Sequence, residues 1–218
     1  MTHKPTQAIL NMIHPDTYVR PTSKKGLGLF AKRKFRRGEI LWIADDFDVK
    51  IPLLNYRQVA ENQRRILDIY SYMDNFERVI VPWDEGKYVN HSCAPNSTGI
   101  IEFDNLTIAF REIQPFEEIV EDYHCYFAHF ETFICRCGTP NCRGLVGCED
   151  PYEPQLRLHL GEIVDDIFSY PQPLLSYKSV ENIEFLRLLE QFKDIKQLKS
   201  SYHESQLNGH CATTHQRL

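Results

Sequence analysis

The sequence has no long apolar run, no excess of positive charge and no internal repeat. A membrane-spanning helix needs about 20 consecutive apolar residues, and no such run occurs in the 218 residues. The segment from Met1 to Asp16 also lacks the basic and apolar regions of a secretory signal. The formal net charge of −5 provides no basic field to draw the chain onto nucleic acid. We therefore expect a soluble intracellular protein without direct nucleic-acid or membrane contacts, cytoplasmic in a bacterium and nuclear or cytoplasmic in a eukaryote.

The chain does have an ordinary apolar content and an unusual group of cysteines. Apolar residues make up 42% of the sequence, which is enough for a core without disulfides. Three of the seven cysteines lie between Cys135 and Cys142, a spacing that suits thiolate binding of a metal better than disulfide pairing. The net negative charge favours a basic partner over an acidic one.

The region before this cysteine group indicates short strands, tight turns and one helix. Apolar residues recur at helical spacing between Tyr56 and Met73, which predicts an amphipathic helix there. The pair Asp104-Asn105 between two β-like runs is typical of a tight hairpin turn. The expected strands are residues 27–31, 40–44, 98–103, 106–110 and 118–120.

The composition changes at about Cys148, and helical spacing of apolar residues follows. Two stripes, separated by Pro171 and Pro173, predict a C-terminal helical hairpin. The stretch from Lys199 is polar, and we expect it to fray. The residues of the two stripes are Leu156, Leu160, Ile163, Val164 and Ile167, then Ile183, Leu186, Leu189, Phe192 and Ile195.

Two loops carry side chains or backbone suited to a ligand. Gly26-Leu27-Gly28 lets backbone amides approach a ligand without a Cβ atom between them, although taken alone the motif is more typical of a plain turn. Residues 90–96, Asn-His-Ser-Cys-Ala-Pro-Asn, place an amide, an imidazole and a thiol in one loop. Taken alone, His91 could also be a buried histidine that only holds two loops together.

The cysteine group supplies three of the four ligands that a closed zinc site needs. Glycine and proline between Cys135, Cys137 and Cys142 let the backbone turn so that three sulfurs converge. By spacing alone, Cys93, Cys125 and Cys148 are all eligible as the fourth ligand, and three reduced cysteines in a loop are the ordinary alternative.

Taken in chain order, these pieces resemble a SET domain followed by a post-SET segment. The resemblance implies an α+β, SET-type fold of small β-sheets with a threaded C-terminal loop, followed by a helical extension. We therefore expect an N-terminal segment at 1–15, a SET domain at 16–130, a post-SET zinc segment at 131–148 and the helical extension at 149–218. The matching strings are residues 26–31 (Gly-Leu-Gly-Leu-Phe-Ala), 88–96 (Tyr-Val-Asn-His-Ser-Cys-Ala-Pro-Asn), 117–123 (Glu-Glu-Ile-Val-Glu-Asp-Tyr) and the cysteine tail 135–144.

The resemblance also implies a reaction and the residues that perform it. Members of this family transfer a methyl group from S-adenosylmethionine to the side-chain amine of a lysine in a protein, here possibly a histone or another basic protein. Tyr123 would be the catalytic residue, at the junction of a cofactor pocket and a lysine channel. The cofactor-binding residues would be Gly26, Leu27, Gly28, Leu29, Asn90, His91 and Leu145, and the zinc ligands Cys93, Cys135, Cys137 and Cys142, with Phe133, Ile134 or Leu145 closing over the site.

The sequence departs from the family pattern at two places. The stretch from Trp42 to Asp48 lacks the usual pocket tyrosine, so the pocket must be completed differently. Glu121 stands where an aromatic residue usually helps to set how many methyl groups are added. The alternative hypothesis is therefore a catalytically weak SET-like module that only binds a basic peptide.

Partner expectations follow from charge and from the C-terminal stripes. The expected substrate is a protein with an exposed lysine in a basic tail, because acidic runs could attract one. The C-terminal helices could also pair with a second copy of the chain. The acidic runs are Asp45-Asp46-Asp48, Glu149-Asp150 and Asp165-Asp166.

Overall fold

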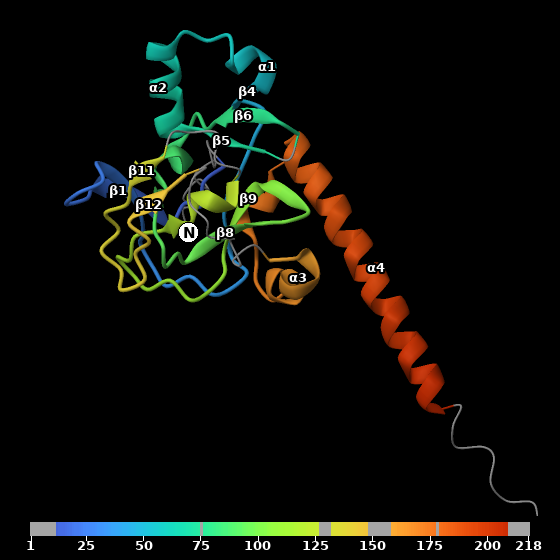
Figure 1. Ribbon diagram of the computed structural model, residues 1–218. Coiled ribbons are helices and arrows are strands. Elements are labelled where there is room, and N and C mark those ends of the chain that lie inside the picture. The colour runs from blue at the N-terminus through green and yellow to red at the C-terminus, as the bar shows by residue number, and fades with distance from the viewer. Residues whose placement is uncertain (1–11, 75, 127–131, 148–157, 178, 209–218) are drawn as a thin grey trace, which may run out of the picture.

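The computed structural model describes residues 12–74, 76–126, 132–147, 158–177 and 179–208. It contains small β-sheets and short helices, followed at the C-terminal end by one much longer helix (Figure 1). No helix of this described part is long and apolar enough to cross a membrane. The elements are β1 (Thr17–Pro21), β2 (Leu27–Ala31), β3 (Ile40–Ile43), β4 (Val49–Pro52), α1 (Leu53–Tyr56), α2 (Glu61–Tyr70), β5 (Tyr72–Met73), β6 (Arg78–Val81), η1 (Glu85–Tyr88), β7 (Asn90–His91), β8 (Ser97–Ile100), β9 (Phe103–Ala109), β10 (Val120–Glu121), η2 (Tyr123–Tyr126), β11 (Phe133–Ile134), β12 (Leu145–Val146), α3 (Leu160–Phe168), η3 (Pro173–Ser176) and α4 (Val180–Asn208).

The strands form two three-stranded sheets and three two-stranded sheets within the described residues. The larger sheets have the orders β3-β9-β8 and β4-β6-β5, and every neighbouring pair in them is antiparallel. The pairs β1-β2 and β11-β12 are also antiparallel, whereas β7 and β10 are parallel. The predicted α+β class is therefore confirmed.

Two groups of buried apolar side chains hold these sheets together. One group joins β2, β3 and the loops around Phe35 and Ile113, and both of these side chains are fully buried. The other joins the β3-β9-β8 sheet to α3 and α4 through residues such as Ile108, Ile163 and Phe185. The C-terminal helices therefore share a core with the sheet, although the far end of α4 extends away from the body (Figure 1).

The parallel pair β7-β10 brings two distant segments of the chain together. Val120 pairs with Asn90 and Glu121 with His91. Asn96 fixes the crossing, because its side chain accepts from the Val120 amide at 2.9 Å and donates to the Glu118 carbonyl at 2.8 Å. This side chain is completely buried, so its hydrogen bonds replace those that it would make with water. The crossing places the loop after Asn90 beside the segment that ends at Tyr123.

Two local predictions from the first half of the chain are wrong. The hairpin between β8 and β9 turns at Ile101-Glu102, and Asp104-Asn105 lies within β9. Glu102 is needed at the turn because its carboxylate accepts from the Leu160 amide at the start of α3, 2.8 Å away. The helix expected over 56–73 is divided into α1, α2 and β5, and no residue of α2 is buried.

The C-terminal stripes also differ in detail from the prediction. On α3, Leu160, Ile163, Val164 and Ile167 are buried as expected, while Leu156 lies outside the described residues. On α4, as far as its side chains are described, the buried apolar residues are Phe185 and Leu189, whereas Ile183 and Leu186 are exposed. The buried face is therefore rotated, because it follows the contact with Phe103 and the sheet. Helix α4 also continues beyond Lys199 to Asn208, where we expected fraying.

Candidate active site and metal centre

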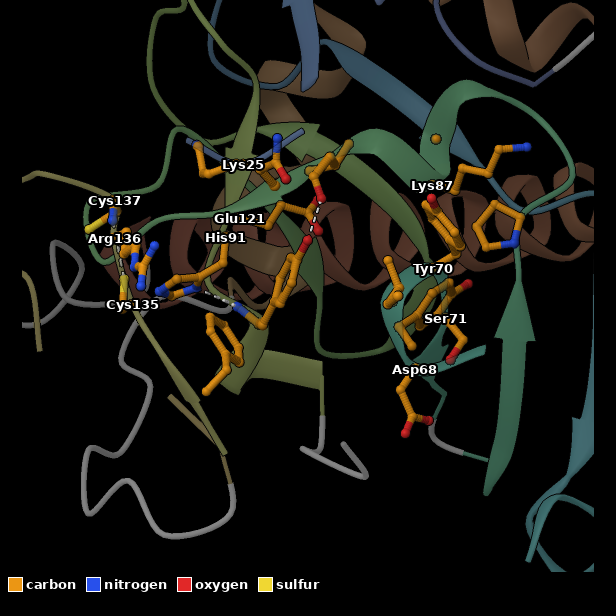
Figure 2. A pocket seen from close by; sticks show the side chains of 18 of the residues that line it. Lys25, Asp68, Tyr70, Ser71, Lys87, His91, Glu121, Cys135, Arg136 and Cys137 are labelled. Atoms are coloured by element: carbon orange, nitrogen blue, oxygen red, sulfur yellow. Dashed lines mark hydrogen bonds between the residues drawn. The ribbon is translucent and has the colours of Figure 1, made fainter. Parts of the chain in front are cut away.

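A cavity of about 510 Å³ lies between α2 and the strand β11. Its walls come from the turn before β2, from α2 and β5, from η1 and β7, and from the segment that follows β11. Figure 2 shows side chains from these separate parts of the chain turned toward one space. The volume falls in the range of about 300–1,000 Å³ that is usual for small-molecule sites. The geometry therefore marks this cavity as the candidate active site.

Tyr123 presents a buried phenol to this cavity from the start of η2. Its hydroxyl donates to the carbonyl oxygen of Val89 at 2.7 Å, which fixes the direction of the ring. Burial raises the pKa of this phenol above its ordinary value, and the nearby carboxylates of Glu121 and Glu118 raise it further. Tyr123 is therefore a neutral, fixed hydroxyl at neutral pH.

His91 connects Tyr123 to the cysteine group. Its Nδ1 accepts from the Tyr123 backbone amide at 3.3 Å, so the proton of the neutral ring lies on Nε2. Nε2 then donates to the Cys93 sulfur, 3.3 Å away. The ring is 5% exposed and also packs against Phe133. His91 thus holds two loops together, as one reading of the sequence suggested, and also lines the cavity.

Asn90 joins the glycine turn to the strand β10. Its side-chain amide donates to the Leu27 carbonyl at 2.8 Å and to the Glu118 carboxylate at 2.9 Å. Glu118 also forms an ion pair with Lys25 at 2.7 Å. A Cβ atom on Gly28 would lie 2.7 Å from the Glu118 carboxylate and 3.0 Å from the Asn90 amide. Gly28 is therefore required because this polar group occupies the space of a side chain.

The four cysteines that the resemblance implied are brought together. The sulfurs of Cys93, Cys135, Cys137 and Cys142 all lie within 4.8 Å of one another. Cys93 and Cys135 are 3.7 Å apart at sulfur, close to the roughly 3.8 Å edge of a tetrahedron with zinc–sulfur bonds of about 2.3 Å. Burial raises the pKa of both of these thiols, so the thiolate form needs a cation beside it. The donor set therefore fits a four-cysteine zinc site.

Of the three candidates for the fourth ligand, Cys93 belongs to this group of described residues. Cys125 lies in η2, and Cys148 lies outside the described residues. The fold thus carries Cys93, one of the three cysteines that spacing left open, to the cysteine tail.

A buried ion pair that the sequence analysis missed ties this tail to the active site. The Arg143 guanidinium donates to both oxygens of Asp122, each at 2.8 Å, and the Asp122 side chain is 1% exposed. The Arg143 backbone amide also donates to the Cys93 sulfur at 3.4 Å. Asp122 directly precedes Tyr123, so the pair couples the position of the tail to that of the phenol. Only adjacency to the motifs Cys142-Arg143-Gly144 and Asp122-Tyr123 could have indicated it.

The predicted cofactor residues divide into two groups. Asn90 and His91 line the cavity, as do Phe133 and Ile134, which were expected to close over it. Leu29 is 1% exposed and belongs to the apolar core, while Leu145 is 52% exposed and does not line the cavity. The cavity is not lined by Gly26, Leu27 or Gly28. Their turn lies next to two lining residues, Lys25 in the chain and Asn90 through its hydrogen bond to the Leu27 carbonyl. Gly26 has a φ of +75°, which explains the glycine at that turn.

The pocket is completed by aromatic residues that the sequence analysis did not place there. Trp42, Tyr70 and Tyr72 line it, so aromatic walls are present without the customary tyrosine after β3. Trp42 is held by a hydrogen bond from its Nε1 to Asp84 at 3.0 Å. Glu121 is 7% exposed and also lines the cavity.

The charges around the cavity do not match the acidic surface expected for a basic tail. Asp45 and Asp48 are buried and accept hydrogen bonds from Trp83, so they offer little surface to a peptide. Asp166 pairs with Arg37, and Glu149-Asp150 lie outside the described residues. Five cationic side chains line the cavity against the two carboxylates Asp68 and Glu121. These lining cations are Lys24, Lys25, Arg65, Lys87 and Arg136.

Comparison with known proteins agrees with this geometry. Residues 26–124 match the model of the SET domain family, and this part of the chain is a SET domain. It contains the glycine turn, the loop after Asn90 and Tyr123, so the resemblance read from these motifs is confirmed.

Several curated relatives are named as histone-lysine N-methyltransferases. The chain is 29% identical over 170 residues to histone-lysine N-methyltransferase ATX2 of Arabidopsis thaliana, which covers 69% of this chain and 16% of that protein. It is 30% identical over 138 residues to human histone-lysine N-methyltransferase 2D, covering 59% of this chain and 2% of that protein. The chain therefore spans a small part of these relatives. Among solved structures, the methyltransferase domain of human SETMAR is 21% identical with a TM-score of 0.45, covering 62% of this chain and 58% of that one.

Proposed function

We propose that this protein is a protein-lysine N-methyltransferase that uses S-adenosylmethionine. The observation that carries the proposal is the buried phenol of Tyr123, held by Val89 inside a cavity that the SET motifs build. Methyl transfer to an amine is an in-line displacement, so the protein must align the amine, exclude water and provide a fixed polar contact. The Tyr123 hydroxyl and the aromatic walls meet these needs.

S-adenosylmethionine would supply an activated methyl group on a positively charged sulfur. Asn90 and His91 lie on the cavity wall where they would border this cofactor, and Phe133 and Ile134 would cover it. The Asn90 amide is already fixed by Leu27 and Glu118, so it would not need to be ordered on binding. These residues fit a bound cofactor beside Tyr123.

Zinc would fix the segment that covers the cofactor. The cysteine residues 135 and 137 line the cavity and also belong to the four-sulfur group. A metal held by Cys93 and the tail would therefore keep Phe133 against His91 and close the cavity to water.

The substrate proposal is a lysine in a protein, and core histones are the first proteins to test because several relatives are named for them. Because five cations line the cavity, peptides with acidic residues near the lysine should be tested as a second group of substrates. The alternative is a peptide-binding module without activity. It predicts that S-adenosylmethionine does not bind and does not raise the Tm.

A two-part experiment tests the proposal. Melting of the purified protein is followed with and without S-adenosylmethionine, since a ligand that binds the native state raises the Tm. Labelled donor is then incubated with histones and a lysine-peptide array, and the products are located by mass spectrometry. We expect a raised Tm and methyl groups on lysine Nζ. An unchanged Tm together with no transfer contradicts the proposal and supports the peptide-binding module, whereas a raised Tm without any transfer contradicts the catalytic part of the proposal alone.

A further inference from the structure

The proposed reaction needs a group that removes a proton from the substrate. A lysine ammonium has a pKa of about 10.4, so roughly one in a thousand is neutral near pH 7.4. Only the neutral amine has the lone pair that attacks the methyl carbon. A titratable group inside the cavity could therefore raise the rate at neutral pH.

Three other titratable side chains of the cavity wall are poorly suited to accept this proton. Tyr123 is a neutral phenol whose proton is directed at the Val89 carbonyl. His91 has its Nδ1 directed at the Tyr123 amide and its Nε2 at Cys93. Asp68 lies on α2 and accepts from the Tyr56 hydroxyl. Each of these groups is already committed to a neighbour.

Glu121 is a carboxylate that the parallel pair β7-β10 places on the cavity wall. The parallel pairing with His91 and a 2.8 Å hydrogen bond from the Ser92 amide to its carbonyl fix its backbone. Its side chain is 7% exposed and lines the cavity. Figure 2 shows Glu121 in the middle of the site, between His91 on one side and Tyr70 on the other.

The surroundings of Glu121 come from several elements. Its charge reaches two phenols, because it contributes to the raised pKa of both Tyr72 in β5 and Tyr123 in η2, after burial. The other titratable groups of the cavity wall are His91 in β7, Asp68 and Tyr70 in α2, Cys135 and Cys137 after β11, and the five lining cations. Glu121 is thus a largely buried carboxylate whose charge acts on phenols from two neighbouring elements.

We propose that Glu121 is the catalytic base, accepting the proton of the substrate lysine's ammonium group before methyl transfer. This role rests on the methyltransferase function proposed above. One N–H bond of the ammonium breaks and the O–H bond of the Glu121 carboxyl forms, so an ammonium and a carboxylate become an amine and a carboxylic acid. The nitrogen lone pair then forms the bond to the methyl carbon, and the electrons of the broken sulfur–carbon bond stay on sulfur.

The cavity makes this transfer easier than it would be in water. Burial disfavours both charged forms, so it raises the proton affinity of a carboxylate and lowers that of an ammonium. In a closed cavity the neutral pair therefore becomes accessible from the ion pair, which is not so for an exposed carboxylate. The aromatic walls of Trp42 and Tyr72 and the 7% exposure of Glu121 supply the burial at this carboxylate, and a bound substrate would complete it.

The pH dependence of kcat/KM for Glu121→Gln tests the role. With the wild type we expect a profile that is nearly flat from about pH 7 to pH 9, because the enzyme uses the ammonium form that predominates there. In Glu121→Gln the rate should follow the free amine and rise about tenfold per pH unit toward the lysine pKa near 10.4. At pH 7.5 the variant should be roughly 10²- to 10³-fold slower, and the difference should shrink as the pH rises.

Two further variants separate a base from a structural residue. Glu121→Asp keeps a carboxylate and should keep the flat pH profile at a lower rate. This variant still tests the role if Glu121→Gln folds poorly. Asp68→Asn removes the other lining carboxylate and should leave the shape of the profile unchanged. If kcat/KM of the wild type and of Glu121→Gln depended on pH in the same way, the role of Glu121 would be contradicted, while the proposed function would stand. A wild type that transfers no methyl group contradicts the proposed function, and the role of Glu121 fails with it.

Discussion

At the scale of single residues, the ion pair between Arg143 and Asp122 shows how the tail is fixed to the active site. Asp122 is buried, and its two oxygens each accept from the Arg143 guanidinium. A buried carboxylate that loses its partner keeps its desolvation cost without compensation. The pair therefore resists any movement of the cysteine tail away from Tyr123.

Replacing Arg143 with Ala should strongly destabilise the fold. We expect a loss of about 3–5 kcal/mol in the free energy of unfolding, measured by urea denaturation, because Asp122 remains buried and unpaired. Arg136→Ala is the matched control in the same tail, since Arg136 is exposed, and should change stability by about 0.5 kcal/mol or less. Equal effects of the two variants would show that the pair does not hold the tail.

Residue roles could be predicted only where a string of residues carried them. Asn90, His91, Tyr123 and the cysteines stood in motifs, and the fold brings them together. Glu118 and Lys25 were missed because an ion pair between segments 93 positions apart leaves no local pattern. Burial of Asp45 and Asp48 was also missed, since a run of carboxylates looks exposed until Trp83 is placed beside it.

At the scale of elements, the segment from β11 to β12 depends on the cysteine group. Each of its strands has only two residues, which gives little intrinsic stability. The four converging sulfurs tie this hairpin to the loop after Asn90. Removal of the proposed zinc should therefore release the hairpin while the larger sheets stay folded.

The zinc content of cysteine variants tests this arrangement. By elemental analysis we expect about one zinc per chain in the wild type. Cys93→Ser should contain clearly less, because it removes one of four ligands, while Cys125→Ser should match the wild type. Chelation should abolish activity and leave most of the circular dichroism signal. A Cys93→Ser protein with full zinc would mean that the tail binds its metal elsewhere.

Element types were predicted more successfully than element boundaries. The amphipathic pattern located α3, because the four apolar residues that the sequence placed in its stripe are all buried in one core. The same reasoning extended α2 too far, since an apolar face alone does not show whether it is buried, and Ile66 and Ile69 are exposed. The β8-β9 turn was misplaced because Asn105 serves inside a strand, where its side chain meets Tyr72 and Glu181.

A pair of substitutions on α4 tests which face of the helix is buried. Phe185 is fully buried, with its ring centroid 5.0 Å from that of Phe103. Phe185→Ala should lower the free energy of unfolding by about 3–5 kcal/mol. Ile183→Ala on the exposed face should lower it by about 0.5 kcal/mol. Thermal or urea denaturation measures both losses. A larger loss for Ile183→Ala than for Phe185→Ala would contradict the buried face seen in the structure and favour the face that the sequence predicted.

At the scale of the whole molecule, the SET domain and the C-terminal helices form one connected core in the described residues. Ile40, Ile100 and Ile108 of the sheet pack with Ile163 and Leu189 of the helices. The sequence predicted the helices but not this contact, because each stripe alone does not name its partner. The β3-β9-β8 sheet therefore packs against helices that lie outside the SET match.

The measurement that tests the central claim most directly is methyl transfer by wild type and Tyr123→Phe under the same conditions. We expect labelled donor to mark a lysine Nζ with the wild type. The variant should bind S-adenosylmethionine with an unchanged Tm shift but transfer roughly 10²- to 10³-fold more slowly, because only a positioned hydroxyl is lost. Equal turnover by the two proteins, or no lysine methylation by the wild type, would contradict the account.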